Sequence, residues 1–215
     1  MSTGANGTAS AFAQDRSFDA EQFKASVKEA AAIDKAMEGK GTDRLRAFLD
    51  RGLDPNKDLV IIGTPLFHAV SLKNLPAVEL LVKRGGNLNA IDAITGWTPL
   101  FAAASIVDVA YLEKLIGLGA DIRARTRDGE SLFLRAAYEA NADLMEYLLA
   151  KQSDPNEKAA VTGMTAAHMA VLVNCAKCVR VLKAHNARMN IKDARGETIA
   201  SLCDRLKNDA CKAAL

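Results

Sequence analysis

The stretch "GWTPLFAAA" at residues 96–104 has an upstream echo in "GTPLFHAVS" at residues 63–71. The same pattern continues with lower fidelity to the end of the chain. Its threonine or serine falls at Thr64, Thr98, Ser131, Thr165 and Thr198. These positions recur about every 33 residues, and a fixed period of this length indicates tandem structural units instead of a single closed core.

The residues of each unit favour two short helices. Thr98 can accept a backbone N–H at the start of a helix, and Pro99 at the first helical position loses only a donor that has no partner there. Apolar pairs at helical spacing then predict a second helix, as around residues 144–149. Gly119 suits the left-handed turn that ends such a helix. Gln152 stands at the same position, and we expect local strain or a different helix ending there.

A second marker keeps step with the first, as in "RGGNLNAID" (84–92), and appears once more upstream as "RGLDPNKD" (51–58). Together the two markers resemble the ankyrin-repeat pattern G-x-T-P-L-H-x-A-A, a helix, and then L-L-x-x-G-A-D-V-N. The resemblance implies an all-α solenoid of stacked helix-turn-helix units with hairpin-like loops, about five to six repeats including caps. The family histidine is present at His168, where it implies hydrogen bonds that brace the adjoining loop. The pattern is not complete in every repeat, since no proline follows Ser131, Thr165 or Thr198.

We expect two parts in the chain: a flexible tail at 1–18 and a single ankyrin-repeat domain at 19–215. A helix over roughly residues 20–37 is expected to serve as an N-terminal cap in front of the degenerate first repeat. The repeats are expected at 31–62, 63–95, 96–128, 129–162, 163–195 and 196–215. In the tail, "ASAFA" before Gln14 resembles the end of a secretory signal but lacks a basic start and an apolar centre. A cytoplasmic protein is the default expectation, and export to the bacterial periplasm is the alternative.

Composition argues against several functional classes. The formal net charge of +2 gives no reason to expect nucleic acid as a partner, and no apolar run is long enough for a membrane span. The sequence has no phosphate-binding loop, no G-x-S-x-G and no H-E-x-x-H. We therefore expect a monomeric non-enzyme without a cofactor.

Four cysteines gather near the C-terminus, and their role is open at this point. They are Cys175, Cys178, Cys203 and Cys211. They are consistent with small buried hydrophobic residues, with disulfides that tie the C-terminal cap together, or with metal or redox chemistry. The C-x-x-C pair lacks both the knuckle turns of a zinc site and the strand-then-helix setting of a redox motif.

A curved solenoid offers its concave side to a partner, and this side consists of the loop tips and the open edge of each first helix. Counting from each Thr or Ser selects partner-binding candidates that are unusually apolar and flank a charged middle. They are Ile61, His68, Leu72, Ile94, Trp97, Ile106, Arg127, Arg135, Tyr138, Met164, Met169, Leu172 and Val173. The sequence therefore predicts a non-catalytic protein–protein interaction module: an adaptor, inhibitor or accessory protein. The alternatives are an exported protein that protects or neutralises its partner, and a cysteine-centred metal or redox protein.

Overall fold

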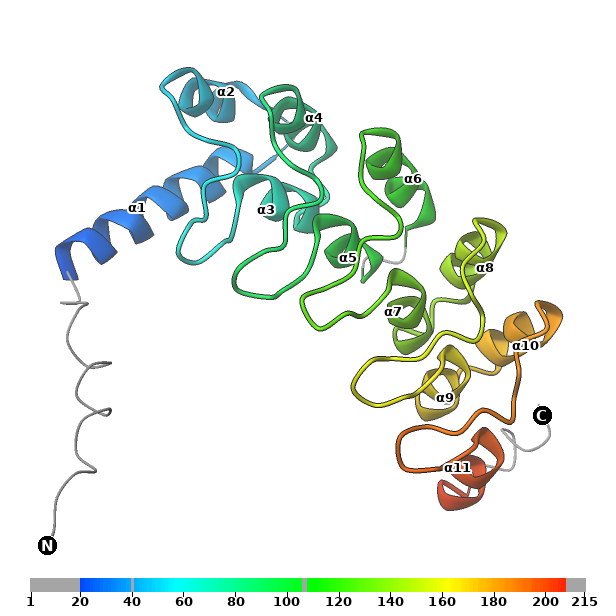
Figure 1. Cartoon of the computed structure of the whole chain (residues 1–215). Coiled ribbons are helices and arrows are strands. Elements are labelled where there is room, and N and C mark those ends of the chain that lie inside the picture. The colour runs from blue at the N-terminus through cyan, green and yellow to red at the C-terminus, as the bar shows by residue number, and fades with distance from the viewer. Residues whose placement is uncertain (1–19, 40, 106–107, 208–215) are drawn as a thin grey trace, which may run out of the picture.

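The computed structural model describes residues 20–39, 41–105 and 108–207. This part of the chain contains eleven helices, and its only β-type pairings are isolated bridges within loops. The helices form two rows that follow an arc, and the loops project like fingers to its inner side (Figure 1). The predicted all-α solenoid is thus confirmed. The expected tail at 1–18, Ile106 and Cys211 lie outside the described residues.

Within the described residues, each of the first five units contributes one helix to each row, and the last contributes α11 to the inner row. The inner row consists of α1 (Ala20–Met37), α3 (Pro65–Ser71), α5 (Pro99–Ala104), α7 (Leu132–Tyr138), α9 (Ala166–Leu172) and α11 (Ile199–Arg205). The outer row consists of α2 (Asp43–Asp50), α4 (Leu75–Lys83), α6 (Val109–Gly117), α8 (Ala142–Ala150) and α10 (Ala176–Ala184). The capping helix α1 covers the predicted range, and no described helix is long and apolar enough to cross a membrane.

The inner helices begin as their sequences predict. The Thr98 side chain accepts the Phe101 N–H at 3.3 Å, and Pro99 occupies the first helical position. In α9, His168 completes a capping box with Thr165: its Nδ1 accepts the Thr165 N–H at 3.2 Å, and its Nε2 lies 3.1 Å from the Glu197 carbonyl oxygen. Because Nδ1 accepts, Nε2 carries the proton and donates to the next loop. The predicted bracing role of this histidine is confirmed.

The outer helices end in left-handed turns. Gly85 and Gly119 have φ values of +90° and +107°, and Gln152 and Asn186 adopt the same turn at +67° and +58°. Gln152 therefore keeps the ending of its neighbours. Of the two outcomes expected there, local strain is the one found, because a non-glycine residue in this region costs roughly 1–2 kcal/mol.

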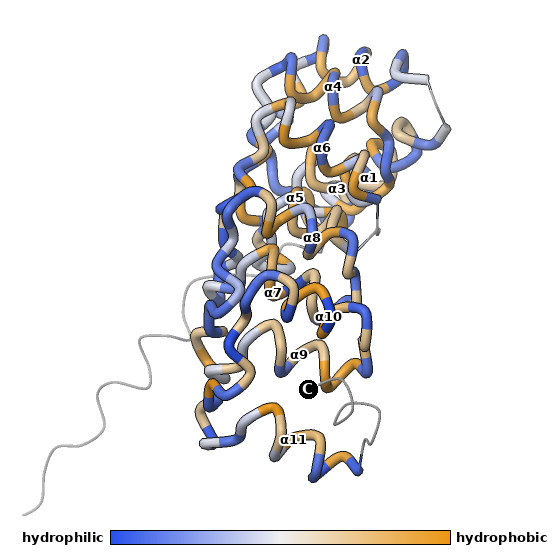
Figure 2. Tube along the Cα trace, turned by 90° about the vertical axis from the view of Figure 1, so that its right-hand side faces the viewer, coloured by the Kyte–Doolittle hydropathy of each residue, from blue (hydrophilic) through white to orange (hydrophobic). Residues whose placement is uncertain are grey.

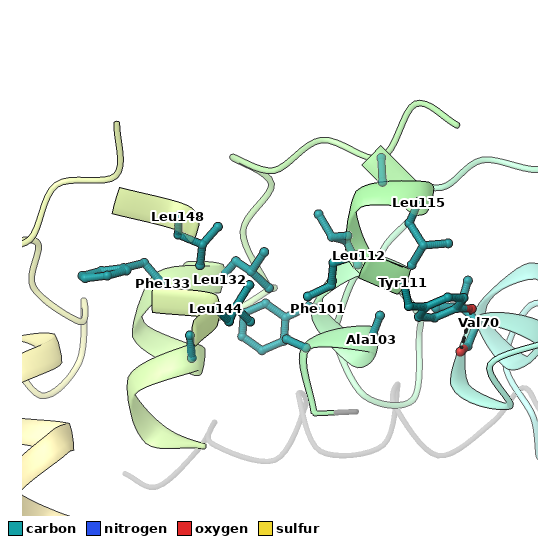
Figure 3. Close-up of a cluster of buried hydrophobic side chains, with 14 of the residues drawn as sticks. Val70, Phe101, Ala103, Tyr111, Leu112, Leu115, Leu132, Phe133, Leu144 and Leu148 are labelled. Atoms are coloured by element: carbon teal, nitrogen blue, oxygen red, sulfur yellow. Dashed lines mark hydrogen bonds between the residues drawn. The ribbon is translucent and has the colours of Figure 1, made fainter. Parts of the chain in front are cut away.

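The core is a continuous layer between the two rows, and no unit encloses it alone. Phe101, Leu112, Phe133 and Leu144 are fully buried and come from successive units (Figure 3). Hydrophobic residues recur along the helices, with hydrophilic ones between them (Figure 2). Each inner helix packs on the next, from α3 on α5 to α9 on α11. Neighbouring units thus bury the apolar faces that a single unit would leave exposed.

Polar groups, both buried and exposed, also join the units. The Tyr111 hydroxyl donates to the Val70 carbonyl oxygen of the preceding unit at 3.2 Å (Figure 3). Burial raises the pKa of Tyr111 to about 12, so the hydroxyl keeps its proton and remains a donor. On the loops, Asn56 donates to the Gly85 carbonyl oxygen at 2.9 Å and accepts the Asn87 N–H at 2.8 Å. These bonds fix consecutive loops in register.

Candidate protein-binding surface

Large exposed hydrophobic side chains concentrate on one side of the described molecule. Except for Phe23 in the capping helix, they lie on the finger loops or at the C-terminal ends of inner helices, a region that we call the concave face. The finger residues are Val60, Ile61, Ile91, Ile94 and Val161, and the helix-end residues are Leu72, Tyr138, Leu172 and Leu206. Within the described residues, the outer helices contribute none. In the described residues, the large exposed apolar side chains therefore lie mainly on the concave face.

The middle of the concave face holds an aromatic–arginine cluster formed by Trp97, Phe101, Arg135 and Tyr138. The Arg135 guanidinium carbon lies 4.6 Å from the Trp97 ring centroid, 5.5 Å from that of Tyr138 and 5.8 Å from that of Phe101. The Trp97 and Phe101 centroids are 5.6 Å apart. A guanidinium over aromatic rings is attracted by their negative faces, so the cluster is held in one arrangement before any partner arrives.

Arg135 has few conventional hydrogen bonds for a half-buried guanidinium. It forms an ion pair with Glu139, and its Nη2 lies 3.3 Å from the Ser105 hydroxyl. Its Nε is buried without a hydrogen-bond partner. Burial raises the pKa of the nearby Glu130, and the positive charge of Arg135 opposes this shift. The centre of the face thus combines a stacked cation with partly desolvated carboxylates.

Most of the predicted candidates lie on the concave face, although they are not equally accessible. The exposed ones are Ile61, Leu72, Ile94, Arg127, Tyr138 and Leu172, and the half-buried ones are Trp97, Arg135, Met164 and Val173. Arg127 lies back along the preceding finger, where its Nη2 is 3.2 Å from the Ala93 carbonyl oxygen. Ile106 lies outside the described residues.

Two of the predictions need correction. Met169 is 8% exposed and belongs to the core, so its place on a partner-binding surface is wrong. The His68 side chain is 17% exposed, and its Nε2 lies 2.7 Å from Asp34 Oδ1 of the capping helix. Both residues stand four positions after their Thr. The His68 side chain reaches the preceding inner helix and is used in that contact, not on the open face.

Val161 is the clearest surface residue that was not among the predicted candidates. It is 81% exposed at a finger tip. It stands four residues before Thr165, as Val60 and Ile94 stand four before their own threonines. The repeat register was the signal that could have found it.

The structure joins Cys175 and Cys178 in a disulfide, with an S–S distance of 2.07 Å. Cys203 is buried and is also disulfide-bonded. In the described part of the chain, no three His, Cys, Asp or Glu residues come together in a way that could hold a metal ion. Of the three interpretations of the cysteines, the disulfide applies to this pair.

Comparison with known proteins agrees with the repeat geometry. The family model described as ankyrin repeats (3 copies) matches residues 33–126 and 108–193. The chain is 34% identical over 83 residues to ankyrin repeat and SAM domain-containing protein 6 of Rattus norvegicus, a match that spans 37% of this chain and 9% of the rat protein. Ankyrin repeats generally mediate protein–protein interactions and are typically non-catalytic. The chain belongs to the ankyrin-repeat family.

Proposed function

We propose that this chain is a non-catalytic module that binds a protein partner through its concave face. The observation that carries the proposal is the distribution of large exposed hydrophobic side chains, which in the described residues, apart from Phe23 of the capping helix, fall on that face and not on the outer helices. Clustered exposed apolar surface marks interaction sites, because covering it with a partner removes it from water.

The aromatic–arginine cluster supplies the anchor of this proposed site. Trp, Tyr and Arg dominate the binding energy of protein interfaces, especially where they are already ordered. Tyr138 is 57% exposed at the edge of the cluster, and Trp97 is held between Phe101 and Arg135. Because the anchor is already ordered, a partner side chain could stack on this edge at little cost in conformational entropy.

A second part of the face accommodates an apolar side chain of the partner. Towards the C-terminal end, a hollow of about 520 Å³ is lined by Val161, Met164 and Leu172, with Arg195 and Arg205 among its charged residues. Apolar walls with a charged rim are typical of protein interfaces. An adaptor, an inhibitor and an accessory protein would all use such a surface, so the partner's identity decides among these roles.

The exported alternative has one observation in its favour. Disulfides persist in oxidising compartments and are rare in the cytosol, and Cys175 and Cys178 are joined by one. An exported ankyrin protein that protects or neutralises its partner would use the same concave face.

The proposal is tested by affinity capture from the native cell with the full chain and three variants. Trp97→Ala removes the centre of the anchor and is expected to weaken capture by about 2 kcal/mol, roughly 30-fold. Tyr138→Ala removes its exposed edge. Glu79→Ala alters an exposed residue of the outer helix α4 and serves as the control. Equal capture of one protein by all four chains would contradict the proposed face.

A further inference from the structure

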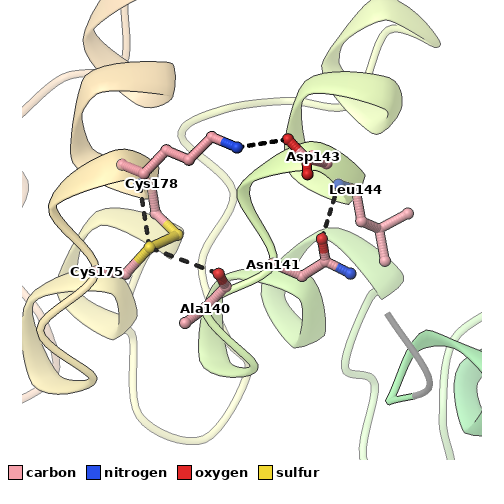
Figure 4. Close-up of a disulfide and its surroundings, with 7 residues drawn as sticks. Ala140, Asn141, Asp143, Leu144, Cys175 and Cys178 are labelled. Carbon is pink, nitrogen blue, oxygen red and sulfur yellow. Dashed lines mark hydrogen bonds and ion pairs between the residues drawn. A yellow bond between two sulfur atoms is a disulfide. The ribbon is translucent and has the colours of Figure 1, made fainter. Parts of the chain in front are cut away.

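The start of helix α10 differs chemically from the starts of the other outer helices. In α4 and α8 the residue before the helix is Asn74 or Asn141, and its side-chain oxygen accepts the N–H three residues later at 3.1 or 3.0 Å. Asp108 does the same for α6 at 3.1 Å. In α10 this position is Cys175, and the residue three positions later is Cys178, to which it is bonded (Figure 4). Because the other units form the same helix without cysteines, the fold does not require the pair.

The two sulfur atoms have unequal access to solvent. Cys178 is 0% exposed within the core, whereas Cys175 is half-buried at the turn between α9 and α10. A thiolate from outside the protein therefore has easier access to Cys175 than to Cys178. Exchange at a disulfide depends on which sulfur can be attacked.

The surroundings of Cys175 suit a thiolate as well as a disulfide. The Cys178 N–H donates to Cys175 Sγ at 3.1 Å, and the first turn of a helix stabilises negative charge. The Ala140 carbonyl oxygen lies 3.6 Å from the same sulfur and can accept from its S–H once the pair is reduced. Lys177, between the cysteines, is held by Asp143 Oδ1 at 2.7 Å (Figure 4). The helix start therefore keeps its partners in both redox states.

We propose that Cys175 and Cys178 form a thiol–disulfide exchange site whose substrates are thiols and dithiols. A substrate thiolate attacks Cys175 Sγ, the bond between the two cysteines breaks, and Cys178 leaves as a thiolate that takes up a proton. A second substrate thiolate attacks the mixed disulfide and releases Cys175. Two thiols are oxidised to one disulfide, and the protein disulfide is reduced to two thiols. The reverse sequence passes a disulfide from the protein to a dithiol.

The test uses the full chain with Cys203→Ser and Cys211→Ser, so that only the pair remains. The oxidised, folded protein is incubated with glutathione in one arm and with reduced thioredoxin in the other, then quenched with acid, alkylated and mapped by mass spectrometry. Alkylation of both Cys175 and Cys178 in either arm supports the proposal, and the arm that reacts identifies a small thiol or a protein dithiol as the source. A folded chain that stays oxidised in both arms, but is reduced after denaturation, would overturn it.

Single-cysteine variants test which sulfur is attacked. With Cys178→Ser added, incubation with oxidised glutathione is expected to place glutathione on Cys175. With Cys175→Ser instead, the buried Cys178 is expected to bind at least about tenfold less glutathione than Cys175 does. Equal labelling of the two would contradict the proposed order of attack. The double change Cys175→Asn and Cys178→Ala recreates the start of α4 and is the folding control, expected to give an unchanged circular dichroism spectrum.

Discussion

His68 and Arg135 occupy the same position in two different repeats, four residues after the Thr or Ser that begins each inner helix. Both reach back to the preceding unit. His68 lies 2.7 Å from Asp34 in the capping helix. Arg135 instead lies over the rings of Trp97 and Phe101 in the repeat before it.

This difference shows how one scaffold position gains or loses a role in recognition. The capping helix presents the Asp34 carboxylate to its neighbour, so the His68 side chain is used in a contact within the chain. The repeat before Arg135 offers aromatic rings, so the guanidinium orders a surface that remains open at Tyr138. The preceding unit, and not the position alone, decides what the concave face presents.

The largest expected effect is that of Phe101→Ala, which removes the buried ring beneath the cluster. Loss of a fully buried Phe side chain is expected to lower the free energy of unfolding by about 3–5 kcal/mol. Urea unfolding checks this value, and the single tryptophan, Trp97, reports the cluster by its fluorescence. Phe67→Ala, near His68, is the matched control, expected to destabilise the protein without changing the Trp97 emission of the folded state.

Arg135→Lys tests whether stacking holds the arginine in place. A lysine keeps the charge but has no planar group to lie over Trp97, so we expect a loss of about 1 kcal/mol in unfolding free energy and a red shift of Trp97 emission. The measurement is urea unfolding followed by fluorescence. Full retention of stability and emission would mean that only the charge at this position matters.

His68→Gln gives a smaller effect, because the Asp34 carboxylate that faces it is partly exposed to solvent. Contacts with a partly exposed carboxylate contribute little, so the unfolding free energy is expected to fall by less than about 1 kcal/mol. Thermal unfolding at low and high salt measures it. A loss as large as that from Phe101→Ala would show that the capping helix depends on this contact far more than its exposure indicates.

Glu130→Gln gives the smallest effect and has a definite pH dependence. Burial raises the pKa of Glu130 in the folded state, so ionising it there costs more than in the unfolded chain. This loss of stability is present at neutral pH, where the carboxyl is ionised. It disappears as the pH falls through the raised pKa of the folded state and then the ordinary pKa of the unfolded chain. Since the carboxyl keeps some contact with water, we expect the variant to be more stable by only a few tenths of a kcal/mol at pH 7. The gain should vanish in acid, and a constant gain at all pH values would contradict this origin.

Local sequence signals predicted the scaffold well because each of them acts within one unit. The caps at Thr64 and Thr98, the left-handed turns after the outer helices and the bond from the Thr165 N–H to His168 depend on neighbours a few residues away. The burial of Met169 and the pairing of His68 with Asp34 depend on how one unit sits on the next. Periodicity gives the register of the repeats but not the side chain that meets each position from the preceding repeat.

The candidate surface shows the same limit. Repeat register placed Ile61, Ile94 and Tyr138 on the concave face, where the structure has them exposed. The same register also points to Val161, which was not among the predicted binding residues. The stacking of Arg135 on Trp97 joins residues 38 positions apart, and the repeat register does not predict which side chains meet at that distance. A disulfide, by contrast, was among the interpretations because four cysteines gather near the C-terminus, and the structure forms one between Cys175 and Cys178.

Site-specific photo-crosslinking tests the central claim most directly. A benzoylphenylalanine replaces Tyr138 on the concave face in one chain and Glu79 on the outer helix α4 in another, and both are irradiated in the native cell. If the concave face is the binding surface, the probe at residue 138 forms a covalent adduct with one protein partner and the probe at residue 79 does not. Adducts with that partner from residue 79, and none from residue 138, would place the binding surface on the outer side and contradict the account.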